Sequence, residues 1–172
     1  KYMTMICGYK TCNEKNELYS ERMKAIRFFE KKDDSFDLFG GGWSRGEYPS
    51  YRGTVDDKLS TLSNYKFSIC FENMKSNNGY ITEKIFDCFF AGCVPIYWGA
   101  EDITDYIPKD IFIDFREFKD FEQLDNYLRN IDEETYRSMI AKTEEFLNSE
   151  MFEKLFSVGA YVKRMTALIL KE

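Results

Sequence analysis

One stretch of the chain carries most of its candidate chemistry. The apolar run at residues 65–71 ends in Glu72 and Asn73, a short polar loop follows, and an amphipathic helix then opens with Glu83 and Lys84. Many α/β folds bind nucleotides with this order of strand, loop and helix, because the free backbone amides at the start of the helix face an anion. The sequence therefore predicts an anion site at this junction.

A diphosphate bound there would need positively charged side chains, since the net charge of the chain is −6. Lys84, in the first turn of the predicted helix, adds an ammonium beside the free amides. Arg22, on an earlier predicted helix, could pair bidentately with the same phosphates, and Arg45 and Arg52 compete for that role. Glu83 could accept hydrogen bonds from both hydroxyls of a ribose.

Each of these residues also has an ordinary structural interpretation. Adjacent Glu83 and Lys84 on an exposed helix more often form only a solvated face. Arg22 has several charged neighbours in the sequence, as on a plain helix surface. Asn73 and Tyr80 would orient ligand hydroxyls only if the site exists. The ordered motif, rather than any single residue, carries the functional prediction.

The elements that must position these residues alternate between strand and helix. Strands are predicted at residues 2–7, 36–39, 65–71, 94–98 and 111–115, and helices at 18–29, 54–62 and 82–91, the last ending at Gly92. Residues 44–53 are predicted to form a long loop. The strands are nearly continuous apolar runs, which indicates a parallel sheet with helices on both faces. We therefore predict a Rossmann-like α/β fold in which the loops after residues 39, 71 and 98 meet.

A length of 172 residues suits a single domain. Residues 1–120 form the predicted α/β core. Residues 121–172 are predicted to be helical, in stretches near 121–130, 133–147 and 151–170, and to cover and close the domain. Because the chain begins with a lysine and enters a strand at once, we expect it to be a fragment of a longer protein.

The composition argues against several classes of protein. A pI near 4.9 is unlike that of general nucleic-acid binders, and no apolar stretch reaches the ~18 residues of a membrane span. Histidine is absent, so any general base is expected to be a carboxylate. The odd number of cysteines, five, favours reduced thiols in a cytoplasm. Cys7 with Cys12 and Cys88 with Cys93 could hold zinc, although Cys88 lies among phenylalanines, as buried thiols do.

Taken together, these motifs resemble the α1,3/4-fucosyltransferase family, and its bacterial members above all. The resemblance rests on residues 65–67 and 71–73, on the Tyr-Ile-Thr-Glu-Lys of residues 80–84 and on residues 91–99, and it extends from the first strand to about Phe121. It implies a GT-B glycosyltransferase with two Rossmann-like domains. This chain is similar to the C-terminal, GDP-fucose-binding domain, with the N-terminal acceptor domain absent.

The resemblance also assigns roles by position in the motif. Glu83 resembles the ribose ligand, and Lys84 and Arg22 resemble the pair that neutralises the diphosphate. Further donor contacts are implied for Asn73, Tyr80 and Tyr51. Family members are inverting enzymes, in which a glutamate deprotonates the acceptor hydroxyl that displaces GDP. No residue here resembles that base, so we assign no catalytic residue to this chain and expect the base in the absent domain.

The implied partners are GDP-fucose and an acceptor oligosaccharide, as in protein glycosylation or lipopolysaccharide O-antigen synthesis. No tightly bound cofactor is implied, no metal ligand is assigned, and metal dependence stays open. The expected location is the cytoplasm, with a full-length bacterial enzyme able to lie peripherally at the inner membrane. Two alternatives keep the same scaffold. One is a transferase that uses another GDP- or UDP-sugar, and the other is a carbohydrate- or protein-binding module without turnover.

Overall fold

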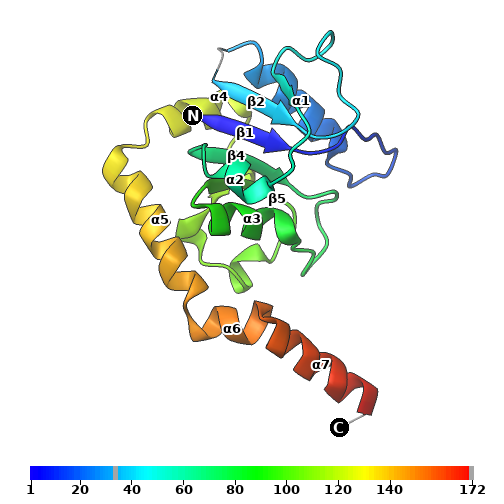
Figure 1. Cartoon of the computed structure of the whole chain (residues 1–172), viewed down its shortest axis with the longest axis vertical. Helices are drawn as coiled ribbons and strands as arrows, with labels where there is room; N and C mark the ends of the chain where they lie inside the picture. The colour runs from blue at the N-terminus through cyan, green and yellow to red at the C-terminus, as the bar shows by residue number, and fades with distance from the viewer. Residues whose placement is uncertain (33–34, 171–172) are drawn as a thin grey trace.

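A six-stranded parallel sheet forms the centre of the computed structural model, which describes residues 1–32 and 35–170. The strands are β1 (Met3–Ile6), β2 (Phe36–Phe39), β3 (Tyr51–Gly53), β4 (Phe67–Phe71), β5 (Val94–Trp98) and β6 (Ile113–Asp114). They are arranged in the order β3-β2-β1-β4-β5-β6 (Figure 1). This is the strand order of a doubly wound Rossmann sheet, and the direction of winding reverses between β1 and β4. The predicted fold class is confirmed.

Both faces of the central strands are buried, because successive side chains point to opposite sides of the sheet. Met3 and Met5 of β1 pack with Ile69 and Phe71 of β4 in the larger core. Cys70, between those two residues of β4, points to the other face and packs in a second cluster. This burial explains why the strands read as unbroken apolar runs rather than as alternating patterns.

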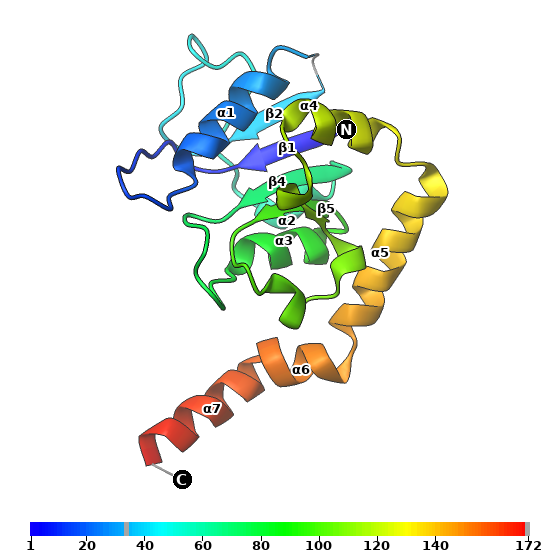
Figure 2. The same cartoon turned by 180° about the vertical axis from the view of Figure 1, so that it is seen from behind.

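Helices cover both faces of the sheet. One face carries α1 (Tyr19–Phe29) and α4 (Phe121–Arg129), and the other carries α2 (Lys58–Leu62) and α3 (Glu83–Ala91) (Figures 1 and 2). The predicted end of α3 is confirmed, since Gly92 caps it with a φ of +67°, a left-handed conformation that glycine adopts without strain.

The helical C-terminal part divides into two kinds of structure. Helix α5 (Glu133–Leu147) packs on the body through Met139 and Phe146. Beyond it, α6 (Glu150–Phe156) and α7 (Val158–Leu170) are separated at Ser157, and α7 buries none of its residues. Figure 1 shows α7 projecting from the body. The prediction that the whole tail covers and closes the domain is therefore wrong for α7, and the single helix expected at residues 151–170 is two.

Three element boundaries also differ from the prediction. The segment expected to be a loop contains β3, a three-residue edge strand without an apolar run, held beside β2 by a bond from the Gly40 N–H to the Gly53 carbonyl. The strand expected at residues 111–115 is reduced to β6 by the turns η2 (Lys109–Ile111) and η3 (Phe115–Glu117).

Helix α2 begins after Asp57, whose carboxylate accepts from the Ser60 N–H, rather than at Thr54. A short turn, η1 (Ile103–Asp105), follows β5.

The loops expected to meet do so in part. The Glu72 N–H donates to the Trp98 carbonyl at 2.8 Å, so the loops after β4 and β5 are in contact. The glycine loop after β2 instead contacts the loop after β1, where the Tyr9 N–H donates to the Gly41 carbonyl. Within the described residues, no helix is long and apolar enough to cross a membrane.

Candidate functional site

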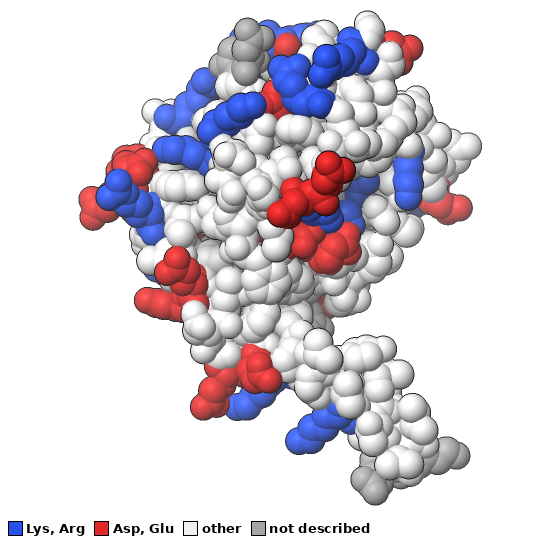
Figure 3. All heavy atoms as spheres, in the orientation of Figure 1, with Lys and Arg blue, Asp and Glu red and all other residues white. Residues whose placement is uncertain are grey.

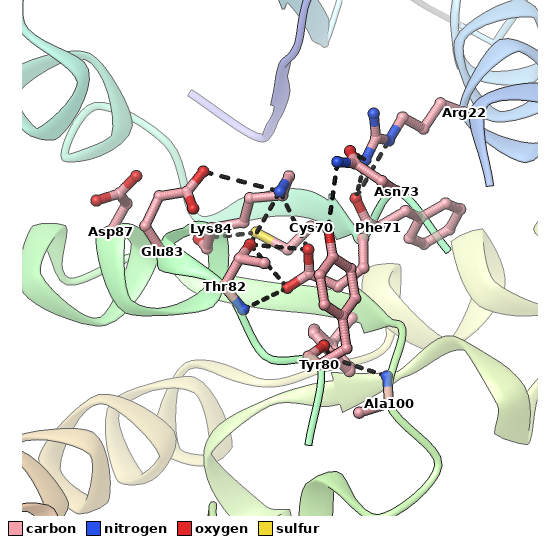
Figure 4. A network of polar contacts seen from close by, with 12 residues as sticks. Arg22, Cys70, Phe71, Asn73, Tyr80, Thr82, Glu83, Lys84, Asp87 and Ala100 are labelled. Atoms are coloured by element: carbon pink, nitrogen blue, oxygen red, sulfur yellow. Dashed lines mark hydrogen bonds and ion pairs between the residues drawn. The ribbon is translucent and has the colours of Figure 1, made fainter. Parts of the chain in front are cut away.

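The candidate site lies at the carboxyl ends of β1 and β4, where the strand order reverses and where ligands of open α/β sheets bind. Three consecutive residues at the end of β4 organise it: Phe71, Glu72 and Asn73. Phe71 and Asn73 contact Arg22 from α1, and Glu72 contacts Lys84 from α3 (Figure 4). The structure thus brings together the two cations that are about 60 residues apart in the sequence.

Arg22 is only 6% exposed, and its guanidinium lies 4.9 Å from the centre of the Tyr19 ring. Its Nε and Nη2 donate to the Phe71 carbonyl at 3.1 and 2.6 Å, and Nη2 also donates to the Asn73 Oδ1 at 2.9 Å. No described residue accepts a hydrogen bond from Nη1, which leaves that nitrogen for an anion (Figure 4). The Asn73 amide donates in turn to the Tyr80 hydroxyl at 3.3 Å.

Lys84 is held by a buried carboxylate. Its Nζ donates to the Glu72 Oε2 at 3.0 Å and to the Thr82 hydroxyl at 2.9 Å, and the Glu72 side chain is fully buried. The same carboxylate accepts from the Thr82 N–H at 2.8 Å, which ties the start of α3 to the end of β4. An ammonium has three hydrogens, so Lys84 keeps one donor for a ligand.

Glu83 lies on the exposed side of Lys84, outside the hydrogen bonds that Glu72 and Thr82 make. Its side chain is 64% exposed, and its carboxylate lies 3.7 Å from the Lys84 Nζ (Figure 4). Burial raises the pKa of Glu83, but a bond from its own backbone N–H and the charges of Lys84 and Lys58 outweigh that effect, so the pKa lies below its ordinary value. Glu83 is therefore an ionised, accessible acceptor of hydrogen bonds at neutral pH.

Arg22 and Lys84 line one small hollow of about 30 Å³, together with Cys7, Lys58 and Asp87 among others. Burial raises the pKa of the Cys7 thiol to about 11, although the charges of Arg22 and Lys84 act in the opposite direction. The thiol is thus neutral beside two cations. The hollow has room for about two water molecules, so a nucleotide would have to lie across its mouth.

Other predicted site residues lie elsewhere. Tyr51 is on the edge strand β3, separated from β4 by β2 and β1, and packs against the larger core. Arg52, a competitor of Arg22, follows Tyr51 on β3 and is bound to Asp37 of β2 at 2.6 Å. The other five predicted site residues lie near one another: Arg22, Asn73 and Tyr80 form one hydrogen-bonded chain, and Glu83 and Lys84 are adjacent on α3.

Sequence reasoning missed Glu72 and Thr82 as supports of Lys84. A charged residue directly after an apolar strand was a usable signal, because a carboxylate that is buried requires a paired cation. The structure supplies that cation twelve residues later.

The cysteines are free thiols. Cys70 and Cys88 lie with Sγ atoms 3.1 Å apart in the cluster that also buries Cys93. In the part of the chain that the structure describes, no group of three or more cysteines or carboxylates is arranged to hold a metal ion, so the zinc alternative gains no support.

Comparisons with known proteins identify the family of this chain. The sequence matches the family model described as glycosyltransferase family 10 (fucosyltransferase), C-terminal, over residues 3–163. It is 36% identical over 103 residues to the alpha-(1,3)-fucosyltransferase FucT of Helicobacter pylori, a match that covers 59% of this chain and 20% of that protein. It is 33% identical over 111 residues to the 4-galactosyl-N-acetylglucosaminide 3-alpha-L-fucosyltransferase 9 of Homo sapiens, covering 62% of this chain and 29% of that one.

A solved structure of an alpha1,3-fucosyltransferase with GDP-fucose superposes with a TM-score of 0.61 at 25% identity, over 81% of this chain and 38% of that one. The chain therefore spans a minor part of the relatives it matches. The family match also continues past Phe121, where the resemblance was expected to end, and takes in most of the helical part. Because it includes the sheet and all the residues around Arg22 and Lys84, the chain belongs to glycosyltransferase family 10, the fucosyltransferases, in its C-terminal region.

Proposed function

We propose that residues 1–172 form the donor-binding domain of an inverting fucosyltransferase, which transfers fucose from GDP-fucose to a hydroxyl of an acceptor glycan. The observation that carries this proposal is the convergence of Arg22 and Lys84 on one hollow at the point where the strand order reverses. Both cations keep a donor that no described residue uses, as an anion site requires.

The donor would be held in two places. Arg22 Nη1 and Lys84 Nζ would bind the diphosphate, and the exposed Glu83 carboxylate would accept hydrogen bonds from the ribose. The linked pair Asn73 and Tyr80 would contact the donor next to Arg22. Tyr51, on the edge strand, would contact only a part of the donor remote from the diphosphate.

In the transfer step, the acceptor oxygen forms a bond to the anomeric carbon while the bond from that carbon to the phosphate oxygen breaks. The electron pair leaves with GDP, and the acceptor proton goes to a glutamate that the remainder of the enzyme would supply. This chain would act electrostatically, because Arg22 and Lys84 stabilise the negative charge that develops on the departing diphosphate. No metal ligand is assigned here.

The first test is nucleotide binding to this chain. We expect GDP to bind at least about tenfold more tightly than UDP, a difference of ~1.4 kcal/mol, when the two are compared by isothermal titration calorimetry. Preference for UDP would instead favour a transferase that uses another nucleotide sugar. Binding of a glycan with no nucleotide affinity would favour the alternative of a binding module, and the donor-domain proposal would then be wrong.

We also propose a cytoplasmic enzyme that lies peripherally on a membrane through α7. This helix exposes a run of apolar side chains: Val158, Tyr161, Val162, Leu168, Ile169 and Leu170. It carries Lys163 and Arg164 and no acidic residue between 158 and 170. In Figure 3 this end of the molecule is mostly free of charged side chains. An apolar face with basic residues suits the interface of an anionic bilayer.

Cosedimentation with vesicles tests this part of the proposal. We expect binding to anionic vesicles that falls more than about tenfold in the double variant Leu168→Asp/Ile169→Asp, because each buried leucine-sized side chain contributes ~1.5–3 kcal/mol. The control is Tyr127→Asp, which changes an exposed apolar side chain on α4 (47% exposed, against 74% for Leu168 and 73% for Ile169). Equal binding by both variants, or none by the wild type, would contradict a membrane role for α7.

A further inference from the structure

A third cation, Lys58, lines the hollow that Arg22 and Lys84 share. It is the first residue of α2, and its side chain is 41% exposed. Its Nζ lies 2.7 Å from the Asp87 Oδ2 on α3, and the Asp87 side chain is 23% exposed. The motif spacing gave no reason to single out Lys58, because α2 lies 25 residues before the start of α3.

Lys58 is bound to Asp87, the second member of an acidic pair on α3. Glu83 and Asp87 are four residues apart on α3 and so lie on the same side of that helix, where two like charges destabilise each other. Figure 4 shows both carboxylates on the same flank of α3. The Lys58 ammonium, fixed by Asp87, compensates this repulsion. Burial lowers the pKa of Lys58, but the bond to Asp87 and the charges of Asp87 and Glu83 raise it above its ordinary value.

The other cation near Glu83 is already engaged. Lys84 donates to Glu72 and Thr82 at 3.0 and 2.9 Å, and its distance to the Glu83 carboxylate, 3.7 Å, is too long for a hydrogen bond. If Lys84 turns its remaining donor to a phosphate, the charge that holds Glu83 must come from a second cation. Lys58 is suited to that task, since its own partner lies one helical turn from Glu83.

We propose that Lys58 is a positioning residue of the donor site, which, anchored by Asp87, holds the Glu83 carboxylate in the orientation that accepts both hydroxyls of the ribose. This inference rests on the proposed function and goes beyond it. It means that Lys58 and Asp87 together make the site select a nucleotide that has the ribose diol over one that lacks it. Lys58 itself makes no contact with the phosphates in this arrangement.

Calorimetry with GDP and with 2′,3′-dideoxy-GDP separates this role from others. For Lys58→Met we expect GDP affinity to fall about three- to tenfold, the effect of one ordinary hydrogen bond, and dideoxy-GDP affinity to stay within twofold of the wild type. An equal loss for both nucleotides would mean a phosphate contact or a general structural effect, and no loss for either would mean no role. Each of these two results overturns the inference.

Two further variants test the same role. Lys58→Arg keeps the charge and should recover most of the GDP affinity. The double variant Lys58→Met/Glu83→Gln should bind GDP as Glu83→Gln alone does, because the two residues act through one interaction. The matched control is Lys66→Met, which removes a lysine of similar exposure (48%) paired with Glu133 away from the hollow. Wild-type protein that fails to bind GDP would refute the proposed function, whereas normal wild-type binding with an unaffected Lys58→Met would refute only the role of Lys58.

Discussion

Replacing Lys84 with alanine is expected to lower the free energy of unfolding by about 3–5 kcal/mol, the usual result of removing one partner of a buried ion pair. The Glu72 carboxylate is fully buried and lies 3.0 Å from the Lys84 Nζ, which is the one cation within salt-bridge distance of it among the described residues. After the substitution, only the Thr82 N–H and hydroxyl would still stabilise that negative charge. Urea denaturation of the two proteins measures the difference.

A double variant provides the control. Glu72→Gln/Lys84→Met removes both charges and keeps side chains of similar size, so its stability should lie much closer to that of the wild type than that of Lys84→Ala does. Equal stability of Lys84→Ala and wild type would show that Glu72 does not depend on Lys84. The comparison also matters for binding studies, because weak GDP binding by Lys84→Ala has two causes, a missing phosphate contact and a damaged site.

Arg22→Lys gives a cleaner measurement of phosphate binding. We expect GDP affinity to fall by about 1.5–3 kcal/mol, or ~12- to 150-fold, the range of a hydrogen bond to a charged group. The guanidinium can bind the Phe71 carbonyl and Asn73 with Nε and Nη2 and still present Nη1 to a ligand. A lysine ammonium is a single point charge and cannot serve both sides with the same geometry. Calorimetric titration with GDP is the measurement.

The same helix offers the control for this substitution. Arg27 lies on α1, is 45% exposed in its side chain and pairs with Glu30, and neither residue lines the hollow. Arg27→Lys should therefore leave GDP affinity unchanged. An Arg22→Lys protein that binds GDP as the wild type does would exclude Arg22 from the phosphate site, and the purpose of its buried guanidinium would then be only to fix the end of β4.

The sheet and the location of the site could be predicted from the sequence because both depend on local patterns. Strands buried on both faces leave continuous apolar runs, and the polar residues that follow them mark the carboxyl ends of parallel strands. Glu83 and Lys84 could be placed at the start of a helix for the same reason. The edge strand β3 (Tyr51–Gly53) leaves no such pattern, since none of its three residues is fully buried and it pairs only with β2.

The partners of the site residues could not be predicted, because they depend on how elements far apart in the chain approach one another. The sequence predicts that the Arg22 guanidinium binds phosphate bidentately. In the structure, three of its hydrogen bonds go to Phe71 and Asn73, because α1 packs beside β4. Nothing local indicates that α7 lacks a surface to pack on. Its apolar residues have the same pattern as those of a helix that covers a core.

The arrangement at the end of β4 has a consequence for protein engineering. One peptide segment, residues 71–73, anchors Arg22 through a backbone carbonyl and an amide and anchors Lys84 through a carboxylate. A small shift of this segment displaces both cations at once, so neither can be tuned in isolation by remodelling the backbone. Attempts to change the nucleotide sugar that such an enzyme accepts should leave these three residues intact and vary the rim around Tyr80 and Glu83 instead.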